Sequence, residues 1–141
     1  MMKLLKNFFF YTYVGLVILA GAWGAFFNPN LDFRYLFDLD TGSLSTYTQI
    51  NMLSQYRFLR ALELGFGVFA ILFYKEIFSV KKFNGLFLAI MGFGILARAV
   101  SWIMDGTPSG LFIFFFAYEA AGWGIIYLYS RKTGIYNAGR K

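Results

Sequence analysis

The sequence predicts an all-α integral membrane protein that folds as a four-helix bundle. Of its 141 residues, 59% are hydrophobic and only 14% are charged, and its mean hydropathy is +0.58. Soluble domains carry about 25% charged residues, so this chain has too few charges to cover a surface that faces water. Its long apolar runs, separated by short polar segments, indicate helices that cross a lipid bilayer.

Four apolar segments account for the four expected helices. They are residues 8–27, 56–78, 83–104 and 110–130. The first is uncharged, matches the roughly 20 residues that a hydrocarbon core of about 30 Å requires, and is followed by Asn28-Pro29. The uncharged part of the second, Leu64 to Tyr74, is too short to cross by itself. We therefore expect Arg60 and Glu63 inside this helix or at its outer edge.

The connections between these helices differ in length. Residues 28–56 are polar with scattered apolar side chains, and we expect one larger extracytoplasmic (periplasmic) loop that lies in the membrane interface or over the helix ends. The third and fourth helices are joined by a tight turn. There Asp105 can accept bonds from backbone amides, Gly106 permits a positive φ and Pro108 fixes φ. Ser109 is the expected N-cap of the fourth helix.

The distribution of charge predicts that both termini are cytoplasmic. The formal net charge is +6, and most of the basic residues lie in three clusters that contain one acid, Glu76. The basic members are Lys3, Lys6, Lys75, Lys81, Lys82, Arg131, Lys132, Arg140 and Lys141. Under the positive-inside bias these clusters are cytoplasmic flanks. We therefore expect no nucleic-acid partner, despite the basic charge.

A cleaved signal peptide is the alternative reading of the first segment. Lys3 and Lys6 precede the apolar run, and Ala20-Gly21-Ala22 resembles a small-residue cleavage site. The apolar run is long for the hydrophobic part of a signal peptide, which favours a retained membrane helix.

Small residues predict where the helices approach one another closely. The pairs four residues apart are Ala20/Gly24, Gly21/Ala25, Ala61/Gly65 and Ala120/Gly124. The glycine pairs two residues apart are Gly65/Gly67, Gly92/Gly94 and Gly122/Gly124. Glycines at this second spacing point to different sides of a helix, so we interpret them as contact points with two neighbours and not as a phosphate-binding loop.

Charged residues within the predicted helices are the candidates for a functional site, because each costs about 2.5–3.5 kcal/mol at the centre of a membrane helix unless it finds a partner or a cavity. The candidate polar core or ligand pocket consists of Arg60, Glu63, Arg98, Ser101, Asp105 and Glu119. Glu119 has no charged neighbour on its own helix. We therefore expect it to meet Arg98 or Arg60 across the bundle, in a hydrogen-bonded charge pair.

This set has three possible roles. It can be a polar lock that fixes how the helices assemble, in which case Asp105 caps the outer turn. It can line an outward-facing pocket for a small polar or anionic ligand, with Arg98 as the anchor. It can also relay protons through Glu119, although without histidine such a relay would need a chain of carboxylates.

The absence of two residue types excludes much chemistry. With no cysteine and no histidine, the chain has no disulfide, no thiolate nucleophile, no histidine general base and no Cys/His zinc site. We expect no catalytic residue, no metal site and no cofactor, because no nucleophile has an adjacent base. Five tyrosines near the predicted helix ends are expected in interfacial belts: Tyr11, Tyr13, Tyr74, Tyr127 and Tyr129.

The segment Arg98 to Ser109 carries the pattern R-x2-S-x3-D-G-x-P-S, and Glu119 and Gly122 follow it. This segment, with Asn28-Pro29 and the Arg- and Gly-rich stretch 57–67, resembles a family of small bacterial four-helix membrane proteins classed as a domain of unknown function. The resemblance covers nearly the whole chain. It implies the fold of a small bacterial membrane protein and singles out these residues, and it implies no reaction.

Two classes of function follow from these observations. The first is a non-enzymatic accessory or structural subunit, or an assembly factor, that docks on other membrane protein subunits of a larger inner-membrane complex. The second is a binding or transport module that takes a small molecule in the polar pocket around Arg98 and Glu119. In both, the lipid bilayer is the surrounding partner.

Overall fold

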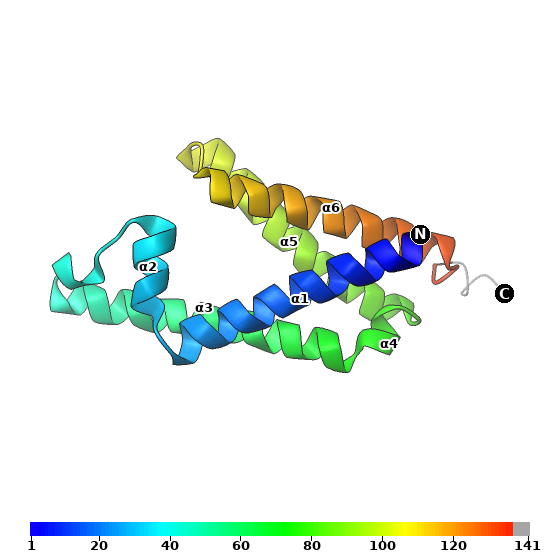
Figure 1. Ribbon diagram of the computed structural model, residues 1–141, viewed down its shortest axis with the longest axis horizontal. Coiled ribbons are helices and arrows are strands. Elements are labelled where there is room, and N and C mark those ends of the chain that lie inside the picture. Colours follow the sequence, from blue (N-terminus) through cyan, green and yellow to red (C-terminus); the bar gives the residue numbers. More distant parts are fainter. Residues whose placement is uncertain (137–141) are drawn as a thin grey trace. The chain divides into compact units, whose positions relative to one another are not determined.

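The computed structural model describes residues 1–136, and every regular element within them is a helix (Figure 1). The elements are α1 (Met2–Phe26), α2 (Pro29–Phe37), the 3-10 helix η1 (Thr41–Ser43), α3 (Thr46–Leu72), α4 (Tyr74–Ile77), α5 (Lys81–Asp105) and α6 (Gly110–Lys132). The prediction of an all-α fold is confirmed.

Three of these helices, α1, α5 and α6, are each long and apolar enough to cross a membrane. They have 25, 25 and 23 residues. At 1.5 Å per residue, each is longer than the hydrocarbon core of about 30 Å. Their apolar composition, rather than an apolar stripe on one face, marks them as helices of a membrane protein.

The chain packs as two compact units. The first unit comprises Met1–Tyr13 and the chain from Leu72 onward, and the second comprises Val14–Ile71. Helix α1 contributes its first half to the first unit and its second half to the second.

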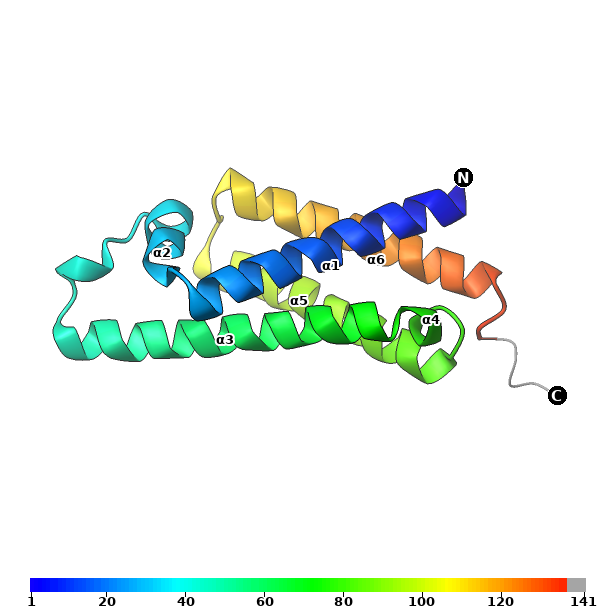
Figure 2. The ribbon, with the colours of Figure 1, turned by 60° about the horizontal axis from the view of Figure 1, so that its bottom comes forward.

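In the first unit, α5 and α6 form an antiparallel hairpin, joined by the turn at residues 106–109 (Figure 2). The core of this unit contains three fully buried side chains, Phe10, Phe87 and Ile126. The indole Nε1 of Trp123 on α6 donates a hydrogen bond to the carbonyl oxygen of Leu88 on α5, at 2.8 Å. This bond adds a directional contact to the apolar packing of the hairpin.

In the second unit, the second half of α1 lies against α3 at very short range. A methyl group added at Gly21 would come within 2.7 Å of the backbone nitrogen of Leu64. One added at Gly24 would come within 2.6 Å of Cγ of Arg60. These glycines allow the two helices to approach closely, as small residues do in membrane bundles.

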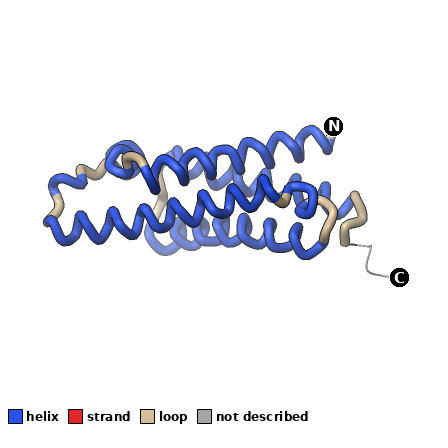
Figure 3. Tube along the Cα trace, turned by 90° about the horizontal axis from the view of Figure 1, so that it is seen from below, coloured by secondary structure: helices blue, strands red, loops and turns tan. Residues whose placement is uncertain are grey.

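Residues 28–56 were expected to form a loop, but most of them are helical (Figure 3). The predicted local structure of this segment is therefore wrong. Pro29 opens α2, because its fixed φ suits the first helical turn. Ser45 precedes α3 and its hydroxyl accepts a bond from the amide of Thr48 at 3.3 Å. This capping bond lets α3 begin at Thr46, ten residues before the predicted start.

The other boundary of the second predicted helix also differs. Helix α3 ends at Leu72, and the chain then forms the single turn α4, where a helix through residue 78 was expected. The remaining predicted helices agree with α5 and α6 within two residues at each end, while α1 starts six residues earlier than expected.

The close contact at Gly21 generates a prediction. We expect Gly21→Ala to lower the free energy of unfolding by about 1–3 kcal/mol, because the added methyl group meets backbone atoms that cannot rotate away. Gly15→Ala, on the same helix with nothing within 4 Å of the new atom, is the matched control and should be neutral or stabilising. Thermal unfolding in detergent distinguishes the two, and equal melting temperatures would contradict the close approach of α1 and α3.

Candidate functional site

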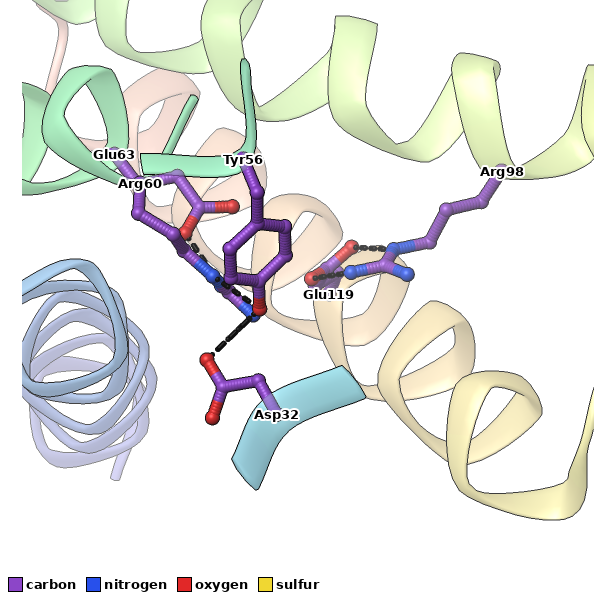
Figure 4. A network of polar contacts seen from close by, with 6 residues as sticks. All are labelled: Asp32, Tyr56, Arg60, Glu63, Arg98 and Glu119. Atoms are coloured by element: carbon purple, nitrogen blue, oxygen red, sulfur yellow. Dashed lines mark hydrogen bonds and ion pairs between the residues drawn. The ribbon is translucent and has the colours of Figure 1, made fainter. Parts of the chain in front are cut away.

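The first cluster of charges is a bidentate pair between α5 and α6. Arg98 Nε donates to Oε2 of Glu119 at 2.9 Å, and Nη2 donates to Oε1 at 3.2 Å (Figure 4). The hairpin brings these residues together although they are 21 positions apart. Of the two partners considered for Glu119, the structure pairs it with Arg98.

The pair is only partly shielded. The side chain of Glu119 is 17% exposed and that of Arg98 is 36% exposed. Both carboxylate oxygens accept a bond, which is the strongest arrangement available to a carboxylate facing a guanidinium. The arginine uses one edge of its guanidinium for the pair, and Nη1 lies outside these two bonds.

Two other members of the predicted pocket do not join this pair. Ser101 and Asp105 lie on α5 and are exposed. Among residues 1–136, no hydrogen bond or ion pair links either of them to Arg98 or Glu119. The candidate site in the first unit is therefore the pair itself.

The turn after α5 agrees with its residue types at Gly106 but not at the two expected capping side chains. Within residues 1–136, no backbone amide donates to the carboxylate of Asp105. Gly106 has φ of +108°, a conformation that side-chain-bearing residues rarely adopt. Ser109 occupies the N-cap position of α6, but its side chain makes no capping bond. Its carbonyl oxygen accepts instead from the amides of Phe112 and Ile113, at 3.0 and 3.1 Å. Pro108, which lies between Gly106 and Ser109 in the sequence, is half-buried.

The second cluster belongs to the second unit and centres on Arg60. Its Nε and Nη2 donate to the hydroxyl of Tyr56 at 2.9 and 2.6 Å, and its Nη1 donates to Oε2 of Glu63 at 2.6 Å. The Tyr56 hydroxyl in turn donates to Oδ2 of Asp32 at 2.8 Å (Figure 4). Asp32 lies 3.9 Å from Nη2 of Arg60, so this guanidinium faces two carboxylates. The cluster holds α2 on α3.

Sequence reasoning missed two members of this cluster. Tyr56 is four residues before Arg60, a spacing that places both on one helix face and that could have identified the contact. Asp32 could not be placed, because α2 was expected to be a loop. Nearby, Nη1 of Arg57 donates to the carbonyl oxygen of Ala25 at 2.6 Å and satisfies a group at the C-terminal end of α1.

A third polar cluster was not predicted at all. Asn84 is fully buried on α5, and its Nδ2 donates to the carbonyl oxygen of Ile77 at 2.9 Å and to Oγ of Ser130 at 2.8 Å. The hydroxyl of Tyr136 donates to Oδ1 of Asn84 at 2.6 Å. Burial raises the pKa of the Tyr136 phenol. Asn84 thereby connects α4, α6 and the segment after α6.

The predicted packing glycines fall into three groups. A methyl group would be crowded at Gly21, Gly24 and Gly122, where it would meet Leu64, Arg60 and Phe9 respectively. At Gly92 it would make an ordinary van der Waals contact with Trp123, at 3.4 Å. At Gly65 and Gly124, no atom of the described residues lies within 4 Å of such a group.

The bidentate geometry generates a prediction for a double-mutant cycle of Arg98→Met and Glu119→Gln. Each single change leaves one ionised group unpaired, so both should destabilise the protein, and the double variant should recover part of the loss. We expect a coupling energy of about 0.5–2 kcal/mol, the range of polar pairs between membrane helices. Asp105→Asn is the control, because Asp105 is outside the pair. A coupling energy near zero would show that the pair does not hold the hairpin.

Comparison with known proteins places the chain in a family. The family model described as "Domain of unknown function (DUF4345)" matches residues 8–130, which include the Arg98–Glu119 pair and the Arg60 cluster. No curated protein matches the chain, and no solved structure matches it. The resemblance to an uncharacterised family is thus confirmed, and the chain belongs to the family of the domain of unknown function DUF4345.

Proposed function

We propose that this protein is a non-enzymatic accessory or structural subunit, or an assembly factor, of a larger complex in the bacterial inner membrane. Its membrane part would be a single bundle of four spans, α1, α3, α5 and α6. Both termini would be cytoplasmic, and the segment from α2 to the start of α3 would be periplasmic.

The proposal that α3 is the fourth span depends on how its charges are satisfied. The helix has 27 residues, hence a length of about 40 Å, but Arg57, Arg60 and Glu63 lie within it. Arg57 bonds to the backbone of α1, and Arg60 bonds to Tyr56 and Glu63. These contacts reduce the cost of placing three charged side chains at the membrane edge.

The orientation rests on the basic residues of the first unit. Lys75, Lys81, Lys82, Arg131 and Lys132 are all exposed in the first unit, as a cytoplasmic flank requires. Arg140 and Lys141, the last members of the basic set, lie outside the described residues.

One observation supports the role of a subunit: the buried polar side chains are hydrogen-bonded within the fold, and α5 presents large apolar groups on its surface. Among residues 1–136, no buried side-chain nitrogen or oxygen lacks a hydrogen-bond partner. The outer surface of α5 instead presents large apolar groups such as Phe93, which is 70% exposed, next to the small exposed residues Gly94 and Ala97. Small residues on a lipid-facing helix allow a partner helix to approach closely.

The alternative is a small-molecule binding or transport module around Arg98 and Glu119. The partly exposed guanidinium of Arg98 favours it, because the edge that is not paired with Glu119 could bind an anionic group. Loss of a co-purified small molecule in Arg98→Met, with stability nearly unchanged, would support this alternative over the subunit.

The topology can be tested with a reporter. A reporter inserted at residue 45, between η1 and α3, should be periplasmic, and one fused to the C-terminus should be cytoplasmic. Paired alkaline phosphatase and fluorescent protein fusions read out both positions. A cytoplasmic location of residue 45 would overturn the proposed orientation.

If the protein is a subunit, a larger side chain at Gly94 should disturb its complex without disturbing its own fold. Gly94→Leu should leave the melting temperature of the isolated protein unchanged, because nothing lies within 4 Å of the new side chain's first atom. It should reduce the size of the complex that the protein forms at its natural abundance, measured on native gels after mild extraction.

Gly15→Leu, which adds the same bulk at an open position on a different helix, α1, is the matched control and should keep the complex intact. If the wild-type protein migrates as a monomer with no stoichiometric partner, the subunit role is wrong.

A further inference from the structure

Lys6 is buried, although the sequence places it in a cytoplasmic flank. Only 2% of its surface is exposed, whereas Lys3 on the same helix is exposed. Burial of an ammonium group without a partner is costly, so the surroundings of Lys6 must replace the water that it loses.

Three aromatic rings surround the ammonium group. Nζ of Lys6 lies 3.8 Å from the ring centroid of Phe78, 4.8 Å from that of Tyr74 and 5.0 Å from that of Tyr129. Within about 6 Å of a ring centroid, a cation is attracted by the negative face of the π system. We call these three residues the aromatic cage.

The cage takes the place of a carboxylate. Nζ donates one hydrogen bond, to the hydroxyl of Tyr74 at 2.7 Å. Within the described part of the chain, no Asp or Glu lies within ion-pair distance of Lys6. The other faces of the ammonium group are therefore stabilised by the rings.

The cage is held in shape by its neighbours. The hydroxyl of Tyr74 donates to Oδ1 of Asn7 at 2.8 Å, which fixes this ring. Phe10, fully buried, packs edge-on against Tyr74 and Phe78, with centroid distances of 5.1 and 5.4 Å. Tyr129 is placed by α6 and contacts Phe78 edge-on at 6.0 Å.

We propose that Tyr74, Phe78 and Tyr129 form an alkylammonium-binding site and that Lys6 is its resident ligand. The proposal goes beyond the role as a subunit and does not depend on it. The site suits a primary alkylammonium group, because the rings attract the cation and the hydroxyl of Tyr74 accepts its hydrogen bond. In the intact chain the lysine side chain fills the site and fastens the first turns of α1 to α4 and α6.

The test replaces the resident ligand with one in solution. Lys6→Ala removes the propylammonium group beyond Cβ, and the variant should melt several degrees below the wild type. n-Propylammonium chloride should raise the melting temperature of Lys6→Ala in a saturable manner, and it should have little effect on the wild type, whose site is filled. The neutral alcohol 1-propanol and sodium chloride at equal ionic strength should not restore stability.

Two outcomes of this test would overturn the proposal. One is an equal effect of n-propylammonium on the variant and the wild type, and the other is equal rescue by 1-propanol. Choline is a further control, because a quaternary ammonium group cannot donate the hydrogen bond to Tyr74 and should rescue less.

A second set of variants keeps the proposal testable if Lys6→Ala does not fold. Lys6→Met retains an apolar side chain of similar length without the charge and should lower the melting temperature, whereas Lys3→Met should not. In a Phe78→Leu background, the effect of Lys6→Met should shrink, because part of the cage is already gone. A Lys6→Met variant as stable as the wild type would show that the rings do not bind the ammonium group.

Discussion

The structure depends on one constraint: a polar group within an apolar bundle must find its partner in the protein, because lipid offers none. Arg98 meets Glu119, Arg60 meets Tyr56 and Glu63, and Asn84 meets Ser130 and the backbone of Ile77. The first and third contacts join different helices, and the hydroxyl of Tyr56 links the Arg60 cluster to Asp32 on α2. The apolar residues therefore keep the chain in the membrane, and the polar contacts determine which helix faces meet.

Close packing and charge pairing are coupled in the second unit. The side chain of Arg60 lies against Gly24, and the backbone of α3 beside Arg60 lies against Gly21. The same helix contact thus positions the guanidinium toward Tyr56 and Asp32. A larger residue at either glycine would separate the helices and also weaken the polar cluster, so the two features cannot vary independently.

Sequence patterns predicted the parts of the fold that depend on local composition. The apolar runs gave α1, α5 and α6, and the absence of a charged neighbour for Glu119 pointed to a partner on another helix. The polar residues before Tyr56 lack a helical period, so α2 and the first turns of α3 were missed. The surroundings of Lys6 and Asn84 were missed for a different reason. Their partners come from segments distant in sequence, and no spacing rule relates them.

Arg98 and Lys6 show two ways to stabilise a positive charge that is shielded from water. The planar guanidinium matches the two oxygens of Glu119, so the pair is neutral and depends on the ionised carboxylate. The compact ammonium of Lys6 is held by ring faces, which carry no net charge and do not titrate with acid. The pair therefore excludes a second cation as long as Arg98 is present. Ring faces discriminate less, because they attract any diffuse cation of suitable size. It follows that a cation from solution can replace the protein's own charged group in the aromatic cage, rather than in the charge pair.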